Sequence, residues 1–178
     1  MTERTLVIGL GNPILTDDGV GVLVGKHVEK ALAAMDLGPV SVTEASAGGL
    51  RLMELMVGFD RVILIDAIMS SNGAAPGTIH TLTLDDLRDI SPTQHSSCAH
   101  DTSLITALEL GKYMGMSLPK EITIFAVEVI NVRDFSEQPT PAVASAVPEV
   151  TRLVLKDLRK KEPCLASPLL KLEQEILN

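Results

Sequence analysis

Residues 5–21 read TLVIGLGNPILTDDGVG, and this stretch decides how the chain folds. Residues 5–8 are a short apolar run, which predicts a buried strand. Gly9 and Gly11 then predict a tight, irregular loop, because glycine adopts backbone angles that other residues avoid. From Val20 onward, apolar residues recur at helical spacing. The stretch therefore predicts a strand, a loop and a helix in immediate succession.

Two adjacent carboxylates, Asp17 and Asp18, stand where the loop meets the predicted helix, at the carboxyl end of the first strand. Binding sites collect at such strand ends in open α/β sheets. A dinucleotide-binding fingerprint is disfavoured, because it needs a third glycine in place of Ile14 and because two acids would repel a pyrophosphate. Two interpretations stay open: an acid that only caps the helix, or one cap beside one metal ligand.

The composition limits the class of protein. The chain has 178 residues, of which 46% are hydrophobic but only 2% are aromatic. An aliphatic core with alternating strands and helices predicts an α/β sandwich, here as a single domain over residues 1–160. Residues 161–178 are expected to form a weakly structured C-terminal tail.

The net charge of −8 argues against nucleic acid or an anionic membrane as a partner. The sequence shows no signal-peptide pattern and no apolar run of membrane-spanning length. Cys98 and Cys164 lack a metal-type spacing and are expected to be reduced thiols. These features predict a soluble, cytoplasmic protein without membrane insertion, and the lack of a long exposed apolar seam favours a monomer.

The strongest strand signal is the run at residues 61–66, whose branched apolar side chains predict a central parallel strand that ends in Asp66. The alternating pattern of residues 78–84 predicts a half-exposed edge strand. Further strands are predicted at residues 40–43 and 122–127, and helices at residues 20–31, 50–56, 85–89, 102–114 and 141–158.

A candidate metal site follows if the first strand and the strand at residues 61–66 are neighbours. Their carboxyl ends then bring Asp18 and Asp66 to one cleft, and right-handed crossovers bring His100 to the same edge. Two carboxylates and one imidazole suit Zn²⁺, Ni²⁺ or Fe²⁺, held weakly enough to exchange.

Each of these residues also has an ordinary structural interpretation. Asp66 would cap the turn that follows it, and His100 would simply stand at the start of a helix whose cap is Asp101 or Thr102. Other candidates for the same edge are His95, Cys98 and Glu128, listed in chain order. The residue pattern alone leaves these alternatives open.

Three motifs together resemble the nickel-iron hydrogenase maturation endopeptidases. They are the stretch at residues 9–21, the sequence Ile65-Asp66-Ala67, and the sequence His100-Asp-Thr-Ser-Leu104. The resemblance covers roughly residues 5–158. It implies a three-layer fold with a twisted, mostly parallel five-stranded sheet, one antiparallel strand, and helices on both faces.

The resemblance also implies a function. Members of the family remove a short C-terminal peptide from the hydrogenase large-subunit precursor once nickel has been inserted. Their metal-contacting positions correspond to Asp18, Asp66 and His100, which would act as both catalytic and metal-binding residues. The nickel is carried by the substrate, and zinc or another divalent metal would occupy the site in vitro. Asp17 is the nearest candidate for a general base, but it is expected to be a structural helix cap.

Two other functions use the same three residues. A non-catalytic nickel carrier or sensor would hold nickel tightly by itself, and it would usually contain a His-rich tract, which this sequence lacks. A peptidase with a resident zinc ion would be purified with stoichiometric metal and would cleave generic peptides.

Overall fold

The structure is a computed structural model that describes residues 3–35, 37–70, 73–90 and 99–160. Its strands are β1 (Thr5–Leu10), β2 (Val40–Ala45), β3 (Arg61–Ile68), β4 (Ile79–Thr83) and β5 (Glu121–Glu128). Its helices are the 3₁₀ turn η1 (Thr16–Gly19), α1 (Val20–Leu32), α2 (Gly49–Met56), α3 (Leu84–Ile90), α4 (Ala99–Tyr113) and α5 (Pro141–Arg159). Within these residues, none of the helices has the length and apolar character needed to cross a membrane.

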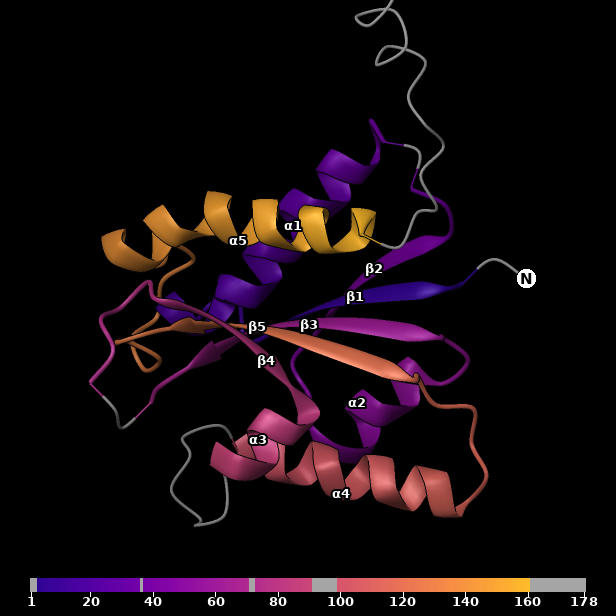
Figure 1. Ribbon diagram of the computed structural model, residues 1–178. Coiled ribbons are helices and arrows are strands. Elements are labelled where there is room, and N and C mark those ends of the chain that lie inside the picture. Colours follow the sequence, from indigo (N-terminus) through magenta and orange to yellow (C-terminus); the bar gives the residue numbers. More distant parts are fainter. Residues whose placement is uncertain (1–2, 36, 71–72, 91–98, 161–178) are drawn as a thin grey trace, which may run out of the picture.

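The five strands form one sheet in the order β2-β1-β3-β5-β4. β1 pairs in parallel with β2 and β3, and β3 pairs in parallel with β5. β4 runs antiparallel to β5 at the edge of the sheet. Figure 1 shows α1 and α5 on one face and α2, α3 and α4 on the other. The predicted three-layer α/β fold, with its antiparallel edge strand, is confirmed.

Aliphatic side chains fill both sides of the sheet. Alternate residues of each central strand point to opposite faces. On one face, Ile63 and Ile65 pack with α1 and α5. On the other face, Val62 and Leu64 pack with α2 and α4. A central strand buried on both faces needs a continuous apolar sequence, which explains the run that begins β3.

Glycines let α1 lie directly on the strand backbones. A β-carbon at Gly21 would collide with the carbonyl oxygens of Leu10 and Ile65. A β-carbon at Gly9 would likewise collide with the carbonyl oxygen of Gly21. The glycines of the first motif therefore bring the start of α1 close to the carboxyl ends of β1 and β3.

Several predicted boundaries are wrong by a few residues. β1 continues through Gly9 to Leu10, because both residues pair with β2. β3 continues to Ile68, because its pairing with β5 extends to Glu128, so Asp66 lies within the strand rather than at its end. The pairing of neighbouring strands here overrides the local sequence preference.

β4 continues directly into α3, and a reciprocal pair of hydrogen bonds between Thr83 and Asp86 forms the start of the helix. The Thr83 N–H donates to Asp86 Oδ2 at 2.6 Å, and the Asp86 N–H donates to Thr83 Oγ1 at 3.3 Å. This arrangement is a capping box, which satisfies backbone donors at a helix start. The hydrogen bonds from Thr83 hold the pKa of the Asp86 carboxyl below its ordinary value.

Candidate functional site

The carboxylate of Asp17 is fully buried and accepts hydrogen bonds from a distant loop. Its Oδ2 accepts from the backbone N–H groups of Ile130 and Asn131 at 3.3 and 3.0 Å. Its Oδ1 accepts from the N–H of Thr140 at 2.6 Å, and Oδ2 also accepts from the Thr140 hydroxyl at 3.1 Å. Asp17 is therefore a structural residue that fixes the segment between β5 and α5.

The carboxylate of Asp18 is only half-buried and has a different environment. Its Oδ2 accepts a hydrogen bond from the N–H of Asn12 at 2.6 Å. Its other oxygen, Oδ1, makes no hydrogen bond to any part of the chain that the structure describes. The N-cap position of α1 is Gly19, without a side-chain cap, so the expectation that an acid caps α1 is wrong.

The loop that carries these acids is joined to the loop after β5. The N–H and hydroxyl of Thr16 donate to the carbonyl oxygens of Ser136 and Asp134 at 2.9 and 2.6 Å. In return, the N–H of Ser136 donates to the carbonyl oxygen of Ile14 at 3.1 Å. Thr16 has a φ of 44°, which is uncommon for a β-branched residue. The two loops therefore form one unit beside Asp18.

Asp66 lies in β3, and η1 packs against this strand. In the register, Asp66 stands opposite Ala126 of β5, which belongs to the apolar cluster beneath α2 and α4. The side chain of Asp66 therefore points to that face, and its Oδ1 accepts a hydrogen bond from the N–H of Ala67 at 2.8 Å. The predicted pairing of β1 with β3 is confirmed, and η1, which carries Asp18, contacts β3. That the carboxylates of Asp18 and Asp66 face one cleft stays a prediction.

His100 lies in the first turn of α4, and the structure does not describe its side chain. The helix starts at Ala99, so Asp101 and Thr102 lie inside it and are not caps, contrary to expectation. His95 and Cys98 are outside the described residues altogether. Among the side chains that are described, no three acids, histidines or cysteines gather as a metal site.

Glu128 has the environment of a structural residue. It is buried at the end of β5, where its Oε1 accepts a hydrogen bond from the N–H of Ser70 at 2.6 Å. Its Oε2 lies 3.3 Å from His80 Nε2 on the neighbouring strand β4. Both carboxylate oxygens of Glu128 therefore have partners, one in the segment after β3 and one on β4.

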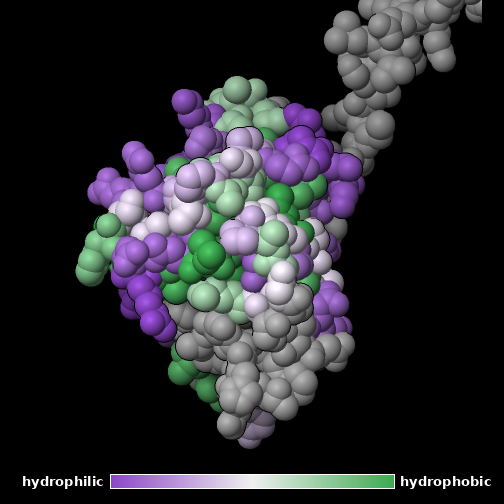
Figure 2. Space-filling model, turned by 90° about the vertical axis from the view of Figure 1, so that its left-hand side faces the viewer, coloured by the Kyte–Doolittle hydropathy of each residue, from purple (hydrophilic) through white to green (hydrophobic). Residues whose placement is uncertain are grey.

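A groove of about 310 Å³ opens next to the joined loops. Its walls are the loop after β1, the first turns of α1 and the segment before α5, and its lining comprises Pro13, Ile14, Thr16, Gly19, Val22, Leu23, Lys26, Glu137 and Pro139. Figure 2 views the molecule from this end of the sheet and shows apolar surface near the centre, with polar surface above it and to either side. The candidate site therefore borders an exposed apolar face.

The partners of Asp17 leave no recognisable pattern in the sequence. Ile130, Asn131 and Thr140 lie more than 110 residues away in the chain. Two of them donate only through the backbone, which leaves no trace in the residue type. Thr140 followed by Pro141 predicts the start of α5, and this start is confirmed, but its hydroxyl serves Asp17 instead of capping the helix.

Comparison with known proteins adds an independent line of evidence. Residues 22–157 match the protein family described as HycI, hydrogenase maturation protease. This range includes Asp66 and His100 and begins just after Asp18.

Individual relatives agree with the family match. The Hydrogenase 2 maturation protease of Escherichia coli K12 is 29% identical over 161 residues, covering 88% of this chain and 92% of the relative. The hydrogenase expression/formation protein HupD of Rhizobium leguminosarum is 27% identical and covers 88% of this chain and 74% of its own length. The solved structure of the hydrogenase maturating endopeptidase HybD from E. coli superposes with a TM-score of 0.73 at 27% identity, over 88% and 93% of the two chains. The chain therefore belongs to the hydrogenase maturation protease family and is an endopeptidase.

Proposed function

We propose that this endopeptidase removes the C-terminal extension of a nickel-iron hydrogenase large-subunit precursor after nickel insertion. In this proposal, Asp18, Asp66 and His100 complete the coordination shell of the nickel that the precursor carries. The observation that carries the proposal is the state of Asp18. One of its oxygens is held by the Asn12 N–H, while Oδ1 has no hydrogen bond within the described residues.

The surroundings of Asp18 favour a weak, single-oxygen ligand. The hydrogen bond to Oδ2 orients the carboxylate, so Oδ1 would be the oxygen that coordinates a metal. The side chain is half-buried, so a metal brought by another protein can reach it. One oxygen from Asp18, one carboxylate from Asp66 and one imidazole make an incomplete ligand set, which suits a metal whose other ligands come from the substrate.

Bound in this way, nickel would polarise the scissile carbonyl or lower the pKa of the attacking water. The protein residues would position the nickel and leave it accessible. Asp17 is a poor candidate for the general base, because it is fully buried and its two oxygens accept four hydrogen bonds. Its proposed contribution is to hold the loop that carries Asp18.

A cleavage assay tests this function. The purified protein is mixed with the precursor, with and without nickel loaded, and loss of the C-terminal peptide is followed by mass spectrometry. Cleavage is expected only with nickel-loaded precursor. Asp18→Asn, Asp66→Asn and His100→Ala are each expected to lower the rate at least 100-fold. Glu29→Gln and His27→Ala, both at exposed positions of α1, serve as controls and should cleave at the normal rate.

Other outcomes would contradict the proposal. Tight binding of nickel by the protein alone, without cleavage of any precursor, would indicate a carrier. Stoichiometric zinc in the purified protein, together with cleavage of generic peptides, would indicate a peptidase with a resident metal. Normal cleavage by all three site variants would show that the site lies elsewhere.

A further inference from the structure

Large apolar side chains are exposed on the loops that follow β1, β3 and β5. Ile14 is 48% exposed, Met69 38%, Ile130 63% and Phe135 81%. All four lie beyond the carboxyl ends of parallel strands, so they share the end of the sheet at which Asp18 and Asp66 lie. Exposed aromatic and aliphatic residues that cluster beside a site are typical of a surface that binds another protein.

The loop that exposes Phe135 is held firmly by its own hydrogen bonds. The side-chain oxygen of Asn131 accepts from the N–H groups of Arg133 and Asp134 at 3.3 and 3.2 Å. The Asn131 amide nitrogen donates to the carboxylate of Asp134 at 2.8 Å. The buried carboxylate of Asp17 also holds this loop, because it accepts a hydrogen bond from the Asn131 N–H. Phe135 is thus presented to solvent by an ordered loop, and a preorganised aromatic group loses little freedom on binding.

The groove next to this loop is large enough to bind side chains of a partner protein. Its volume of about 310 Å³ lies at the lower end of the range for small-molecule sites, and it is open to solvent. Its apolar lining includes Ile14, Val22 and Leu23, with Lys26 and Glu137 as charged members. Such a groove accommodates one or two protruding side chains of a folded partner.

We infer that Ile14, Ile130, Phe135 and the groove form the surface onto which the folded body of the precursor docks. This inference rests on the proposed function. The surface is continuous with the proposed site, because the Ser136 N–H donates to Ile14 O at 3.1 Å and the Asp18 N–H donates to Leu15 O at 2.9 Å. A partner that presents a metal to Asp18 therefore meets this surface.

The alternative occupants fit less well. A net charge of −8 opposes the association of two copies of this chain and disfavours an anionic membrane. The hydrophobic residues are spread over two loops and an open groove rather than gathered in one enclosed cavity. This shape suits the surface of a folded protein better than a short free peptide.

The inference is tested with a double variant, Ile130→Ala with Phe135→Ala, assayed over a range of nickel-loaded precursor concentrations. The KM for the precursor is expected to rise at least tenfold while kcat stays within twofold, because the altered side chains bind the partner and do not touch the scissile bond. The single variant Phe135→Leu keeps a large apolar side chain, so it is expected to retain most of the wild-type affinity for the precursor. The matched control is Tyr113→Ala with Met114→Ala, at the last residue of α4 and the residue after it, where both side chains are also largely exposed.

Direct binding separates this inference from the proposed function. Precursor is captured on a sensor surface and titrated with each protease variant. This assay measures binding and does not depend on cleavage of the precursor. Weaker binding of the Ile130/Phe135 variant, with normal binding of the Tyr113/Met114 control, supports the docking surface. Equal binding and an unchanged KM overturn it, even if the wild-type protein cleaves the precursor. A change only in self-association, measured by sedimentation, would assign the surface to a second copy and also overturn it.

Discussion

Asp17 and Asp18 are neighbours in the chain, yet their carboxylates have opposite surroundings. Asp17 is fully buried and accepts hydrogen bonds from three backbone N–H groups and one hydroxyl. Asp18 is half-buried and accepts from a single backbone N–H. A 3₁₀ turn over the two residues directs one side chain inward and the other toward solvent.

The first prediction concerns the stability of variants at these two positions. Asp17→Ala is expected to lower the free energy of unfolding by about 3–5 kcal/mol, because the backbone N–H groups of Ile130, Asn131 and Thr140 lose their acceptor in a buried place. Asp18→Ala is expected to cost about 1 kcal/mol, since it removes one hydrogen bond near the surface. Urea unfolding followed by circular dichroism measures both values. Similar losses for the two variants would contradict the structural role of Asp17.

At the level of single residues, the sequence predicts which acids matter but not how they are held. The pair at positions 17 and 18 is recognisable because two acids follow a glycine-containing loop at a strand end. The interpretation with one cap and one metal ligand is wrong about the cap, and the metal-binding role of Asp18 stays a prediction. The structural acid does not cap its own helix. It binds a loop far away in the chain, and no local pattern contains that information.

At the level of secondary structure, α1 determines how closely the first loop approaches the sheet. Gly21 lies against the carbonyl oxygens of Leu10 and Ile65, so no side chain fits between helix and strands there. One turn later, a β-carbon at Gly25 would be 3.6 Å from the α-carbon of Gly9, which is an ordinary contact. A β-carbon is therefore excluded at Gly21 but tolerated at Gly25.

This difference gives a second prediction. Gly21→Ala is expected to destabilise the protein by about 3 kcal/mol, because the added methyl group forces the helix away from the strands. Gly25→Ala is expected to be neutral or to stabilise the protein by about 0.5–1 kcal/mol, because alanine favours the helix and fits the available space. Thermal and urea unfolding of both variants test the contrast. A similar effect of the two substitutions would show that α1 does not depend on close packing at Gly21.

Apolar periodicity predicts every strand and nearly every helix of the described chain, because burial on one or both faces leaves a clear pattern in the sequence. The ends of the elements are less predictable. Gly9 and Asp66 are poor strand formers and read as strand ends, yet both lie in extended pairings. Asp101 and Thr102 are good caps by residue type, yet they lie inside α4. Neighbouring elements, rather than local preference, set these boundaries.

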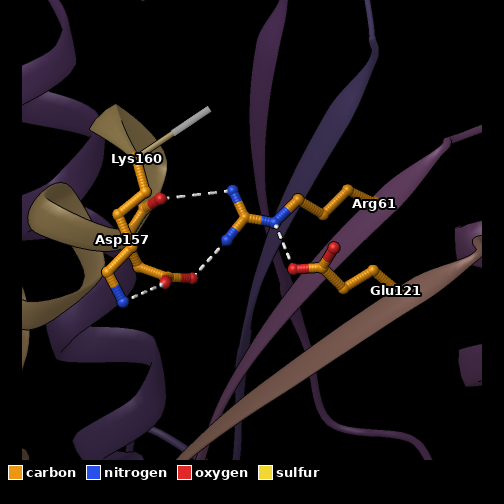
Figure 3. Close-up of polar contacts among 4 residues, drawn as sticks. All are labelled: Arg61, Glu121, Asp157 and Lys160. Carbon is orange, nitrogen blue, oxygen red and sulfur yellow. Dashed lines mark hydrogen bonds and ion pairs between the residues drawn. The ribbon is translucent and has the colours of Figure 1, made fainter. Parts of the chain in front are cut away.

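At the scale of the whole molecule, an ion cluster around the buried side chain of Arg61 joins α5 to the end of the sheet opposite the candidate site. Figure 3 shows the guanidinium of Arg61, at the start of β3, between Asp157 of α5 and Glu121 of β5. Arg61 is almost fully buried, and its Nη1 donates to the carbonyl oxygen of Asp157 at 3.3 Å. Its Nη2 donates to the Asp157 carboxylate, and its Nε lies 3.4 Å from Glu121 Oε1. The cluster connects the helix layer with two central strands.

The third prediction follows from this burial. Arg61→Ala is expected to lower the free energy of unfolding by about 3–5 kcal/mol, because it leaves the largely buried carboxylate of Asp157 without its main partner. Lys160→Ala removes a second, exposed partner of Asp157 and is expected to cost less than about 1 kcal/mol. Urea unfolding of both variants gives the comparison. A loss below 1 kcal/mol for Arg61→Ala would mean that the cluster contributes little to the packing of α5.

The joined loops at residues 11–19 and 129–140 also have a consequence for folding during synthesis of the chain. Asp17 lies 113 to 123 residues before the groups that donate to it. A nascent chain that has emerged from the ribosome only as far as β4 therefore has the loop with both acids but none of the groups that donate to Asp17. The hydrogen bonds of Asp17 can form only after the start of α5 has left the exit tunnel. The anchoring of this loop is thus a late step of synthesis, when nearly the whole domain is available to fold.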